Sequence, residues 1–240
     1  MSKYPADKIR NICLTGHGRA GKTTLCEAML YTAGATDRYG SVADGTTVTD
    51  YDPEEVKRNF SISTAVAPLE WKGNKVNLID APGYFDFVGG VMEGLRGCDS
   101  TVIVVSGRSG MAVGTENACR FALQRKLPVA VFINKLDDER ADFDKVLSQI
   151  KERFGTAVVP FVLPITKGGK LTGFVDVVKQ KAYEYDGFKP KQTDVPAEME
   201  GAIAAARDAL MEQIAESDEE LMEKFFEGEA FTDAEILKGI

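Results

Sequence analysis

The sequence is poor in features on which several function classes depend. It has no apolar stretch of membrane-spanning length, and residues 1–10 lack the apolar core of a signal peptide. These absences predict a cytoplasmic protein with no membrane partner. There is no basic excess either, because the formal net charge is -8. Coating nucleic acid non-specifically requires a basic face, so we expect no non-specific nucleic-acid binding. Any RNA partner must be met locally or through another part of a larger protein.

Cysteine is also scarce. Its four positions are scattered without paired spacing, and two of them fall in apolar strand or helix contexts: Cys13, Cys26, Cys98 and Cys119. Buried free thiols are therefore expected rather than disulfides or zinc ligands. At 240 residues the chain can bury a substantial core and hold one large domain, or a domain with an appendage.

The sequence is organised around a glycine-rich turn within residues 11–24. An apolar run ends in Gly16, and Gly21-Lys22-Thr23 opens a segment with helical apolar spacing, which matches the phosphate-binding pattern G-x-x-x-x-G-K-[ST]. The glycines let backbone N–H groups point inward to an anion at the helix N-terminus. Lys22 would bind the terminal phosphates and the Thr23 hydroxyl Mg²⁺. The predicted nucleotide contacts are Gly16, His17, Gly18, Arg19, Ala20, Gly21, Lys22, Thr23 and Thr24; the alternative is a chance glycine turn.

The remaining pattern predicts an α/β fold of the P-loop NTPase type, with a mostly parallel sheet flanked by helices. Strands are expected at residues 9–15, 61–71, 75–79, 100–106 and 128–133, the second and third as an antiparallel hairpin and the last two buried. Helices are expected at 22–33, 85–96 and 112–126. Residues 34–59 show no sustained period, and a loop of this length is usually functional or mobile.

A second motif, Asp80-Ala81-Pro82-Gly83, follows directly on one of these strands. An aspartate there can hold Mg²⁺ through water, and a glycine can bring its N–H close to a γ-phosphate. The tetrapeptide alone is a weak signal that favours a simple turn. Its place behind a strand and after a phosphate loop makes a nucleotide role the stronger interpretation.

The third motif is Asn134-Lys135-Leu136-Asp137, again at the end of a predicted strand. Asp137 can accept both the N1–H and the exocyclic amine of guanine, a donor pair that adenine lacks. Asn134 and Lys135 would brace the base edge and the loop. A polar strand exit is the alternative, but the order of the three motifs favours guanine.

Together the three motifs resemble those of GTPases, and the flanking sequence is most similar to the translational GTPases of the elongation factor G type. The similar segments are Gly16-His17, residues 57–63 (K-R-N-F-S-I-S) and residues 80–87 (D-A-P-G-Y-F-D-F). Residues 160–165 and 173–183 resemble the subdomain inserted in the G domain of that factor. The resemblance covers nearly the whole chain and implies residues 1–158 as a GTP-binding core and 159–240 as the inserted α+β subdomain.

The resemblance also implies GTP or GDP and Mg²⁺ as cofactors and the ribosome as partner. GTPase-type release factors and tetracycline-resistance ribosomal protection proteins are related alternatives. The implied Mg²⁺ ligands are Thr23, Ser61 and Asp80, and the implied catalytic residues are Lys22, Gly83, Tyr84 and Arg19.

Tyr84 departs from the family, which has a histidine there that is thought to position the attacking water. Phenol is a poor base near neutral pH because its ordinary pKa is about 10. It can still orient a water by hydrogen bonding, or it can simply pack. His17 is the sole histidine, and since the family carries one at this position, it is expected to brace the loop.

Two further departures concern charge and hydroxyl groups. Arg19 stands where the family usually has an aspartate that favours a monovalent cation near the phosphates. We hypothesise that its guanidinium replaces that cation and acts partly as an arginine finger in cis; the alternative is that it points to solvent. Ser61 replaces the family's threonine but keeps the hydroxyl that Mg²⁺ needs, with less rotameric restraint.

The C-terminal third has a different pattern. Residues 158–185 are expected to form a few strands broken by Gly168-Gly169 and Gly173. Helices are expected at 198–217 and 218–228, and a third from Thr232, an N-cap with Glu235 at capping-box spacing, to the terminus. The acidic helix faces predict a solvated surface, or, by the resemblance, contact with a ribosomal stalk protein.

The last sheet strand of the family, with its Ser-Ala-type loop behind the guanine, is not found before Ile240. We therefore expect a fragment whose 128–133 strand is an unprotected sheet edge and whose guanine affinity is below that of an intact factor. Two function classes remain: a ribosome-stimulated GTPase, and a nucleotide-sensing ribosome-binding module in which Tyr84 leaves hydrolysis vestigial. P-loop kinases and ATPases have no use for Asn134-Lys135-Leu136-Asp137.

Overall fold

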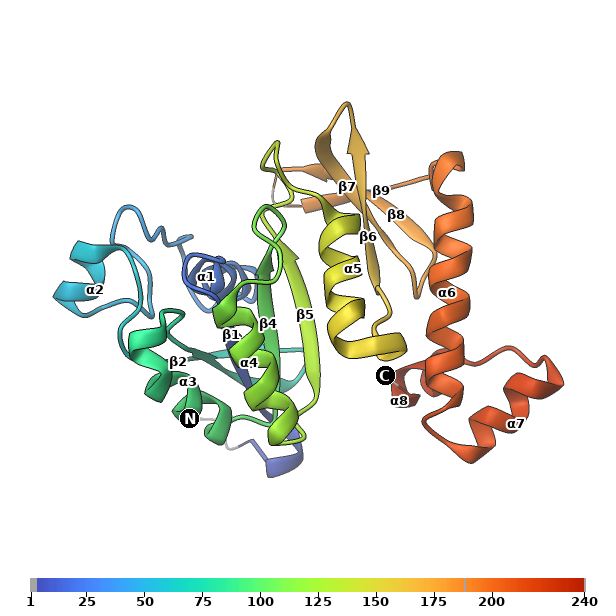
Figure 1. Ribbon diagram of the computed structural model, residues 1–240, viewed down its shortest axis with the longest axis horizontal. Helices are drawn as coiled ribbons and strands as arrows, with labels where there is room; N and C mark the ends of the chain where they lie inside the picture. Colours follow the sequence, from blue (N-terminus) through green and yellow to red (C-terminus); the bar gives the residue numbers. More distant parts are fainter. Residues whose placement is uncertain (1–3, 188, 240) are drawn as a thin grey trace. The chain divides into compact units, whose positions relative to one another are not determined.

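The computed structural model describes residues 4–187 and 189–239 (Figure 1). They divide into two compact units, Met1–Asp142 and Phe143–Ile240, of which residues 1–3, 188 and 240 lie outside the description. The compact units divide between Asp142 and Phe143, and the sequence-based domain boundary between 158 and 159 stays a prediction. Helix α5 (Phe143–Phe154) belongs to the second unit, because Phe143 packs against that unit's core.

The first unit is a five-stranded sheet with helices on both faces. The strand order is β2-β3-β1-β4-β5; β3, β1, β4 and β5 are parallel, and β2 pairs antiparallel with β3. This confirms the α/β fold and the predicted hairpin. The elements are the 3-10 turns η1 (Ala6–Lys8) and η2 (Phe85–Phe87), the strands β1 (Ile9–Gly16), β2 (Ala65–Trp71), β3 (Asn74–Asp80), β4 (Ser100–Ser106) and β5 (Val129–Asn134), and the helices α1 (Lys22–Thr32), α2 (Pro53–Arg58), α3 (Val88–Gly97) and α4 (Val113–Gln124).

The core lies on both sides of this sheet because successive strand residues point to opposite faces. On β1, Leu14 packs with Cys26 and Leu30 of α1. Its neighbour Cys13 packs on the other face, with Leu95 of α3. All four cysteines are buried and outside disulfides, as the sequence predicts.

Three sequence-based element predictions in this unit need correction. Residues 34–59 contain a short helix, α2, which Asp52 and Glu55 begin with a capping box and Pro53 at its first turn. The D-P-E-E sequence was the available signal. Strand β2 starts at Ala65 rather than 61, and the helix expected at 85–96 begins with a separate 3-10 turn.

Strand β5 is the outer strand of the sheet among the residues that the structure describes, as expected for the 128–133 segment. It is not buried as predicted, because only one of its edges is paired. Phe132 is 42% exposed, and its neighbours on the strand are partly exposed. A run of apolar residues does not distinguish an inner strand from an outer one.

The second unit combines an antiparallel sheet with helices. The sheet order is β6-β7-β8-β9, and Ile203 and Ala206 of α6 pack on it together with Val175 and Ala182. A smaller cluster joins Leu210 and Ile236 of the helical end. The elements are α5, the turns η3 (Gly155–Ala157) and η4 (Ala197–Met199), the strands β6 (Val162–Lys167), β7 (Lys170–Asp176), β8 (Lys181–Asp186) and β9 (Lys189–Thr193), and the helices α6 (Glu200–Ala215), α7 (Glu219–Glu227) and α8 (Asp233–Gly239).

Glycine marks one strand break here and not the other. Gly168 and Gly169, with φ of 60° and 77°, form the turn between β6 and β7, as predicted. Gly173 does not break the sheet: it lies inside β7, where a Cβ would meet the Tyr183 carbonyl oxygen at 2.1 Å. Strand β9 was not predicted, because K-P-K-Q-T lacks the apolar alternation of a strand.

The helix signals of the C-terminal segment are confirmed. Asp218 caps α7 through the Glu220 N–H, and Gly228 ends it in the left-handed region. Thr232 and Glu235 form the expected reciprocal capping bonds at the start of α8, although the predicted terminal Ile240 lies outside the described residues. Within residues 4–187 and 189–239, no helix combines the length and the apolarity needed to cross a membrane.

Candidate functional site: a phosphate loop, two buried aspartates and a base loop

The carboxyl ends of β1, β3 and β5 bring the three sequence motifs to one edge of the parallel sheet (Figure 1). The chain leaves β1 at Gly16, whose φ is 130° and whose added Cβ would meet the Val104 carbonyl oxygen at 2.3 Å. Gly21, with a φ of 102°, precedes α1. Only glycine fits these two positions without strain, so the local sequence determines the loop.

Lys22 is the buried cation of the loop. Its side chain folds back over the turn, and Nζ donates to the carbonyl oxygens of Gly16 at 3.2 Å and His17 at 3.0 Å. The residue is 5% exposed. Burial lowers the pKa of Lys22, and the negative charges of Asp80 and Asp50 act against that shift.

The second motif touches the phosphate loop directly. A Cβ on Gly83 would lie 2.3 Å from Lys22 Nζ and 2.7 Å from the Gly18 nitrogen. Any side chain at position 83 would therefore fill the space beside the ammonium group. The absence of a side chain leaves room there for an anion against Lys22 and the loop N–H groups.

Hydroxyl and carboxylate oxygens lie next to this anion-binding space, here called the phosphate cradle, which Lys22, Gly83 and the loop N–H groups surround. The Thr23 and Ser61 hydroxyls are 3.2 Å apart, and the Thr49 hydroxyl donates to Asp80 Oδ2 at 2.8 Å. Asp80 Oδ1 and both carboxylate oxygens of Asp50 are buried without a hydrogen bond of normal geometry among the described residues. Such a set of oxygen ligands fits a hard cation such as Mg²⁺.

Thr49 and Asp50 were not among the predicted site residues. They lie in the 34–59 loop, where the only signal was a polar run, T-T-V-T-D at residues 46–50. Asp50 is 4% exposed and Thr49 2%. Their burial beside Asp80 depends on the path of the loop, which no local pattern specifies.

The two aspartates have unusual electrostatics. Burial raises the pKa of Asp80 to about 6, although the Thr23 hydroxyl, Lys22 and the Thr49 hydroxyl favour its ionised form. Burial also raises the pKa of Asp50, despite the proximity of the Ser61 hydroxyl. A cation bound between them would stabilise both ionised carboxylates.

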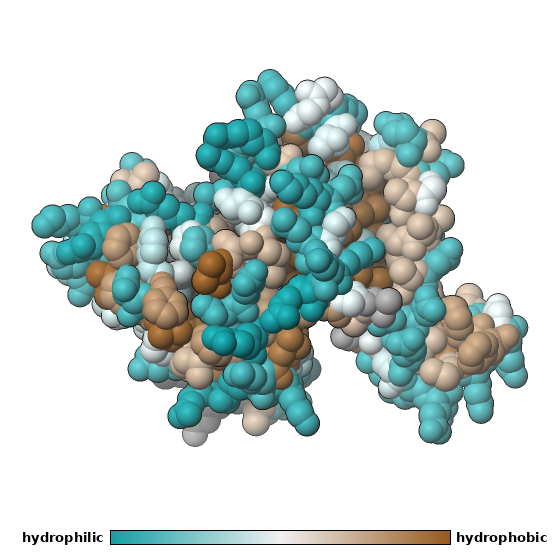
Figure 2. Space-filling model, in the orientation of Figure 1, coloured by the Kyte–Doolittle hydropathy of each residue, from teal (hydrophilic) through white to brown (hydrophobic). Residues whose placement is uncertain are grey.

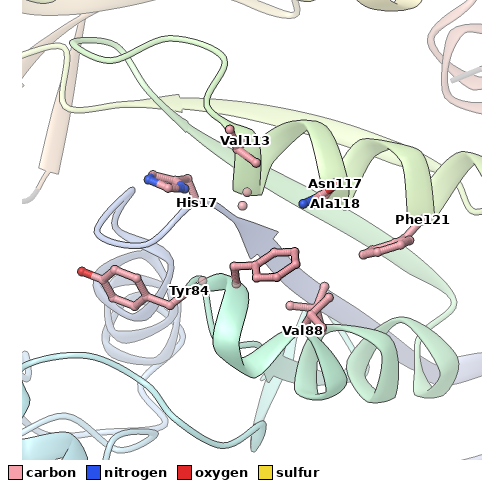
Figure 3. Close-up of a pocket in the computed structure, with 12 residues that line it drawn as sticks. His17, Tyr84, Val88, Val113, Asn117, Ala118 and Phe121 are labelled. Atoms are coloured by element: carbon pink, nitrogen blue, oxygen red, sulfur yellow. The ribbon is translucent and has the colours of Figure 1, made fainter.

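Tyr84 packs against the phosphate loop. A Cβ on Gly18 would lie 3.0–3.1 Å from its ring, and the Phe60 ring meets it edge-on at a centroid distance of 4.8 Å. In Figure 3 its hydroxyl points away from Val88 and Phe121. The Tyr84 side chain thus lies over the loop. Its ring contacts support the packing interpretation, and its hydroxyl lies on the loop side, where it could also orient a water.

A small cavity of about 70 Å³ lies behind Tyr84, between α3 and α4 (Figure 3). Gly16, His17 and Gly83 form one wall, and apolar side chains such as Val91 and Phe121 form another. Neither Lys22 nor Thr23 lines it. The cavity is therefore not the phosphate cradle, although it shares a wall with it.

The base loop is joined to the phosphate loop by Asn134. Its Nδ2 donates to the Ala20 carbonyl oxygen at 3.0 Å, and its Oδ1 accepts from the Lys135 N–H at 2.8 Å. The Lys135 and Asp137 side chains are exposed, and the Leu136 side chain lies against Gly107. The structure therefore brings Asn134 to the cradle and leaves Asp137 at the open edge.

The other predicted residues fall into two groups. Ala20, Ala81 and Pro82 are buried beside the loop and shape it. Arg19 and Thr24 are exposed, and Arg19 has a φ of 61°. His17 is exposed too, with its backbone against Gly114.

The comparisons with known proteins agree with one another. Residues 7–236 match the sequence family described as elongation factor Tu GTP binding domain. A curated protein of Thermotoga maritima, named elongation factor G-like protein, is 39% identical over 230 residues, which cover 96% of this chain and 32% of that protein. A crystal structure of a Thermus thermophilus protein matches with a TM-score of 0.91 and 40% identity, covering 97% of this chain and 35% of that chain. The chain thus spans about a third of the length of these relatives.

Asp80 should give the chain an inverse pH dependence of stability. Its pKa is 3.8 as a free side chain and about 6 in the folded state, so between these values the folded state binds more protons than the unfolded state. Stability therefore falls as pH rises through this window and stays lower above it. We expect Asp80→Asn to raise the free energy of unfolding at pH 7 by up to about 3 kcal/mol in urea titrations without nucleotide or Mg²⁺.

The matched control is Asp86→Asn, because Asp86 is an exposed carboxylate of the same segment. It should leave the stability and its pH dependence unchanged. In Asp80→Asn most of the pH dependence of the unfolding free energy should disappear. A smaller part, due to Asp50, should remain. A variant that is less stable than the wild-type chain at pH 7 would show that Asp80 is not a strained charge.

Proposed function

Because this chain belongs to the elongation factor Tu GTP binding domain family of translational GTPases, we propose that it binds Mg²⁺·GTP and hydrolyses it to GDP and phosphate as the G domain of a ribosome-associated factor resembling elongation factor G. The observation that carries this proposal is the convergence of three loops. Gly83 lies against Lys22, and the Asn134 side chain donates a hydrogen bond to the phosphate loop. The Thr23 hydroxyl lies within hydrogen-bonding distance of the Ser61 hydroxyl.

The phosphate end is assigned to the loop from Gly16 to Thr24. The N–H groups at the start of α1 and the Lys22 ammonium would bind the β- and γ-phosphates. Gly83 would place its N–H against the γ-phosphate, since it lies next to Lys22 Nζ. Catalysis of phosphoryl transfer depends mainly on such positioned positive charge, because the transition state spreads negative charge over the phosphoryl oxygens.

The metal end is assigned to hydroxyls and carboxylates. The Thr23 and Ser61 hydroxyls would be direct Mg²⁺ ligands, and Asp80 and Asp50 would hold its water ligands. When bound, the ion neutralises charge on the phosphates. Thr49 orients the Asp80 carboxylate by its hydrogen bond to Oδ2.

Hydrolysis requires that the attacking water be oriented. Tyr84 lies over Gly18 and next to Gly83, and we assign its hydroxyl to this task rather than to proton abstraction. The Phe60 ring packs edge-on against the Tyr84 ring, with their centroids 4.8 Å apart, and restricts the rotation of the Tyr84 side chain. This role would make Tyr84 a functional substitute for the family's histidine.

Arg19 is assigned to charge neutralisation near the phosphates. It is exposed at the rim of the loop, in a left-handed backbone conformation that turns the chain there. A guanidinium at that position carries a permanent positive charge, whereas the family's aspartate needs a bound monovalent cation.

The ribosome is the proposed partner, reached through the longer factor to which this chain would belong, and the cytoplasm is the proposed compartment. The second unit offers a surface for a ribosomal stalk protein. Phe226 on the acidic helix α7 is 80% exposed and Phe225 40%. Figure 2 shows an apolar patch over α7 surrounded by hydrophilic residues.

Guanine selection should depend on the Asp137 carboxylate. Asp137→Asn replaces one acceptor oxygen by an NH₂ group, which faces the donors of guanine. We expect GDP affinity to fall by at least about a hundredfold, while xanthosine diphosphate, whose C2 carbonyl accepts a hydrogen bond, binds better than GDP. Calorimetric titration measures both. Asp138→Asn is the control, and equal displacement of bound GDP by ATP and GTP would refute the guanine assignment.

Tyr84→Phe tests the water-orienting hydroxyl. In the longer factor with ribosomes, loss of the hydroxyl should lower kcat roughly a hundredfold with little change in KM. Tyr51→Phe, at an exposed tyrosine, should leave kcat unchanged. If Tyr84→Phe has no effect and Tyr84→His raises turnover greatly, the nucleotide-sensing module with vestigial hydrolysis is the better description.

If Arg19 replaces the monovalent cation, the rate of GTP hydrolysis should not depend on which monovalent cation is present. Single-turnover rates in potassium and in sodium buffers should agree within about twofold for the wild-type chain, because the guanidinium supplies the charge. Arg19→Asp should make the rate depend on potassium. A strong potassium requirement of the wild-type chain would show that Arg19 does not replace the cation.

A further inference from the structure

Two buried carboxylates outside the nucleotide motifs accept hydrogen bonds from backbone N–H groups of residues 40–63, here called the switch segment. Glu27 is 1% exposed and Glu55 is 2% exposed. The switch segment contains Thr49, Asp50 and Ser61, the residues that it brings to the proposed magnesium and phosphate centre. Burying a carboxylate is unfavourable unless hydrogen bonds replace its water, so the bonds of these two glutamates are informative.

Glu27 joins α1 to the first half of the switch segment. Its Oε2 accepts the Gly40 N–H at 3.1 Å, and its Oε1 accepts the Val48 N–H at 2.6 Å. One carboxylate thereby holds both ends of the 40–48 loop. Glu27 lies one helical turn after Thr23, so it connects the loop to the same helix that carries the phosphate-binding residues.

Gly40 is fitted to this contact. A Cβ on it would lie 2.3 Å from Glu27 Oε2 and 2.8 Å from the Thr46 carbonyl oxygen. Within the loop, the Ser41 N–H donates to Thr46 Oγ1 at 3.0 Å, and the Thr46 N–H donates to the Ser41 carbonyl oxygen at 3.1 Å. The loop is therefore a closed unit that the Glu27 carboxylate attaches to α1.

Glu55 holds the second half. Its Oε1 accepts the N–H groups of Ile62 at 2.8 Å and Ser63 at 2.9 Å, and its Oε2 accepts the Asp52 N–H at 3.3 Å. The same side chain thus completes the capping box of α2 and fixes the backbone that follows Ser61. Charge-assisted bonds of this kind are about twice as strong as neutral ones.

The spacing connects these anchors to the site. Val48 directly precedes Thr49 and Asp50, and Ile62 directly follows Ser61. Every anchored N–H except that of Gly40 is therefore one or two residues from a side chain of the proposed site. We propose that Glu27 and Glu55 are positioning residues that hold Asp50, Thr49 and Ser61 in register with Thr23 and Asp80. This inference rests on the proposed nucleotide function and adds residues that lie outside its motifs.

Glutamine variants of the whole 240-residue chain test the proposal. An amide has one acceptor oxygen, and its NH₂ group would face a backbone donor, so each variant loses at least one charge-assisted bond. We expect Glu27→Gln and Glu55→Gln to weaken binding of a non-hydrolysable GTP analogue with Mg²⁺ by about tenfold or more. GDP binding in EDTA, which uses the phosphate and base loops alone, should stay within about twofold of the wild-type value.

The controls separate positioning from general stability. Glu54→Gln changes an exposed carboxylate of the same helix as Glu55, and Glu70→Gln changes one on β2; both should bind like the wild-type chain. Gly40→Ala disturbs the Glu27 contact without altering the carboxylate and should reproduce the selective loss. If Glu27→Gln does not fold, Gly40→Ala decides for that anchor.

Amide hydrogen exchange of the wild-type chain is an independent readout. The N–H groups of Gly40, Val48, Ile62 and Ser63 should exchange much more slowly than the N–H of Ala43, an exposed residue of the same segment. Exchange as fast as that of Ala43 would overturn the proposal. Equal losses of the GTP analogue and of GDP in the variants, or no loss of either, would overturn it as well. A wild-type chain that binds neither nucleotide would instead refute the proposed function itself.

Discussion

The burial of the Lys22 ammonium group inside its own loop is the constraint on which the site depends. Its bonds to the Gly16 and His17 carbonyl oxygens close the turn, and its positive charge favours the ionised forms of Asp80 and Asp50. One ammonium cannot compensate two buried carboxylates fully, since burial still raises the pKa of both. The site therefore holds unfavourable charge that a bound cation and its phosphate ligands would relieve. Proteins often accept reduced stability at functional sites for this reason.

The switch segment shows how such a site is assembled from distant parts of the chain. The carboxylates in and around this segment do not all have the same role. Among the described residues, Asp50 and Asp80 have oxygens without hydrogen bonds, whereas both oxygens of Glu27 and both of Glu55 accept hydrogen bonds from backbone N–H groups. Bonded carboxylates fix the backbone, and unbonded ones remain available to a ligand. Burial alone does not distinguish the two kinds, but their hydrogen bonds do.

The second unit has a different physical basis. Its sheet is antiparallel and short, and helix α6 covers it through Ile203 and Ala206. Helices α7 and α8 are held together by the ion pair of Lys224 with Glu235 and that of Lys238 with Asp218, which are surface contacts of modest strength. The exposed Phe226 is consistent with a surface that serves an external partner.

The sequence by itself determined the three loops, their order, the strands that precede them and the family they resemble. These features follow from local chemistry: Gly21 has a φ of 102°, which strains any other residue, and a Cβ on Gly83 would clash with Lys22. The Thr232 capping signal is also local and was correctly predicted, whereas Asp218 was predicted to begin a helix but was not named as its cap. The D-P-E-E start of α2 was also local, and it was missed because the surrounding loop has no apolar period.

Only the tertiary structure decided which carboxylates meet at the site. Thr49 and Asp50 are distant in sequence from Asp80, and their approach depends on the Glu27 and Glu55 anchors rather than on a pattern. The exposure of β5 and the position of Gly173 inside β7 likewise depend on which strands are neighbours. Contacts between residues far apart in the chain carry no local signal, because the hydrogen bonds and burial that specify them exist only once the chain has folded.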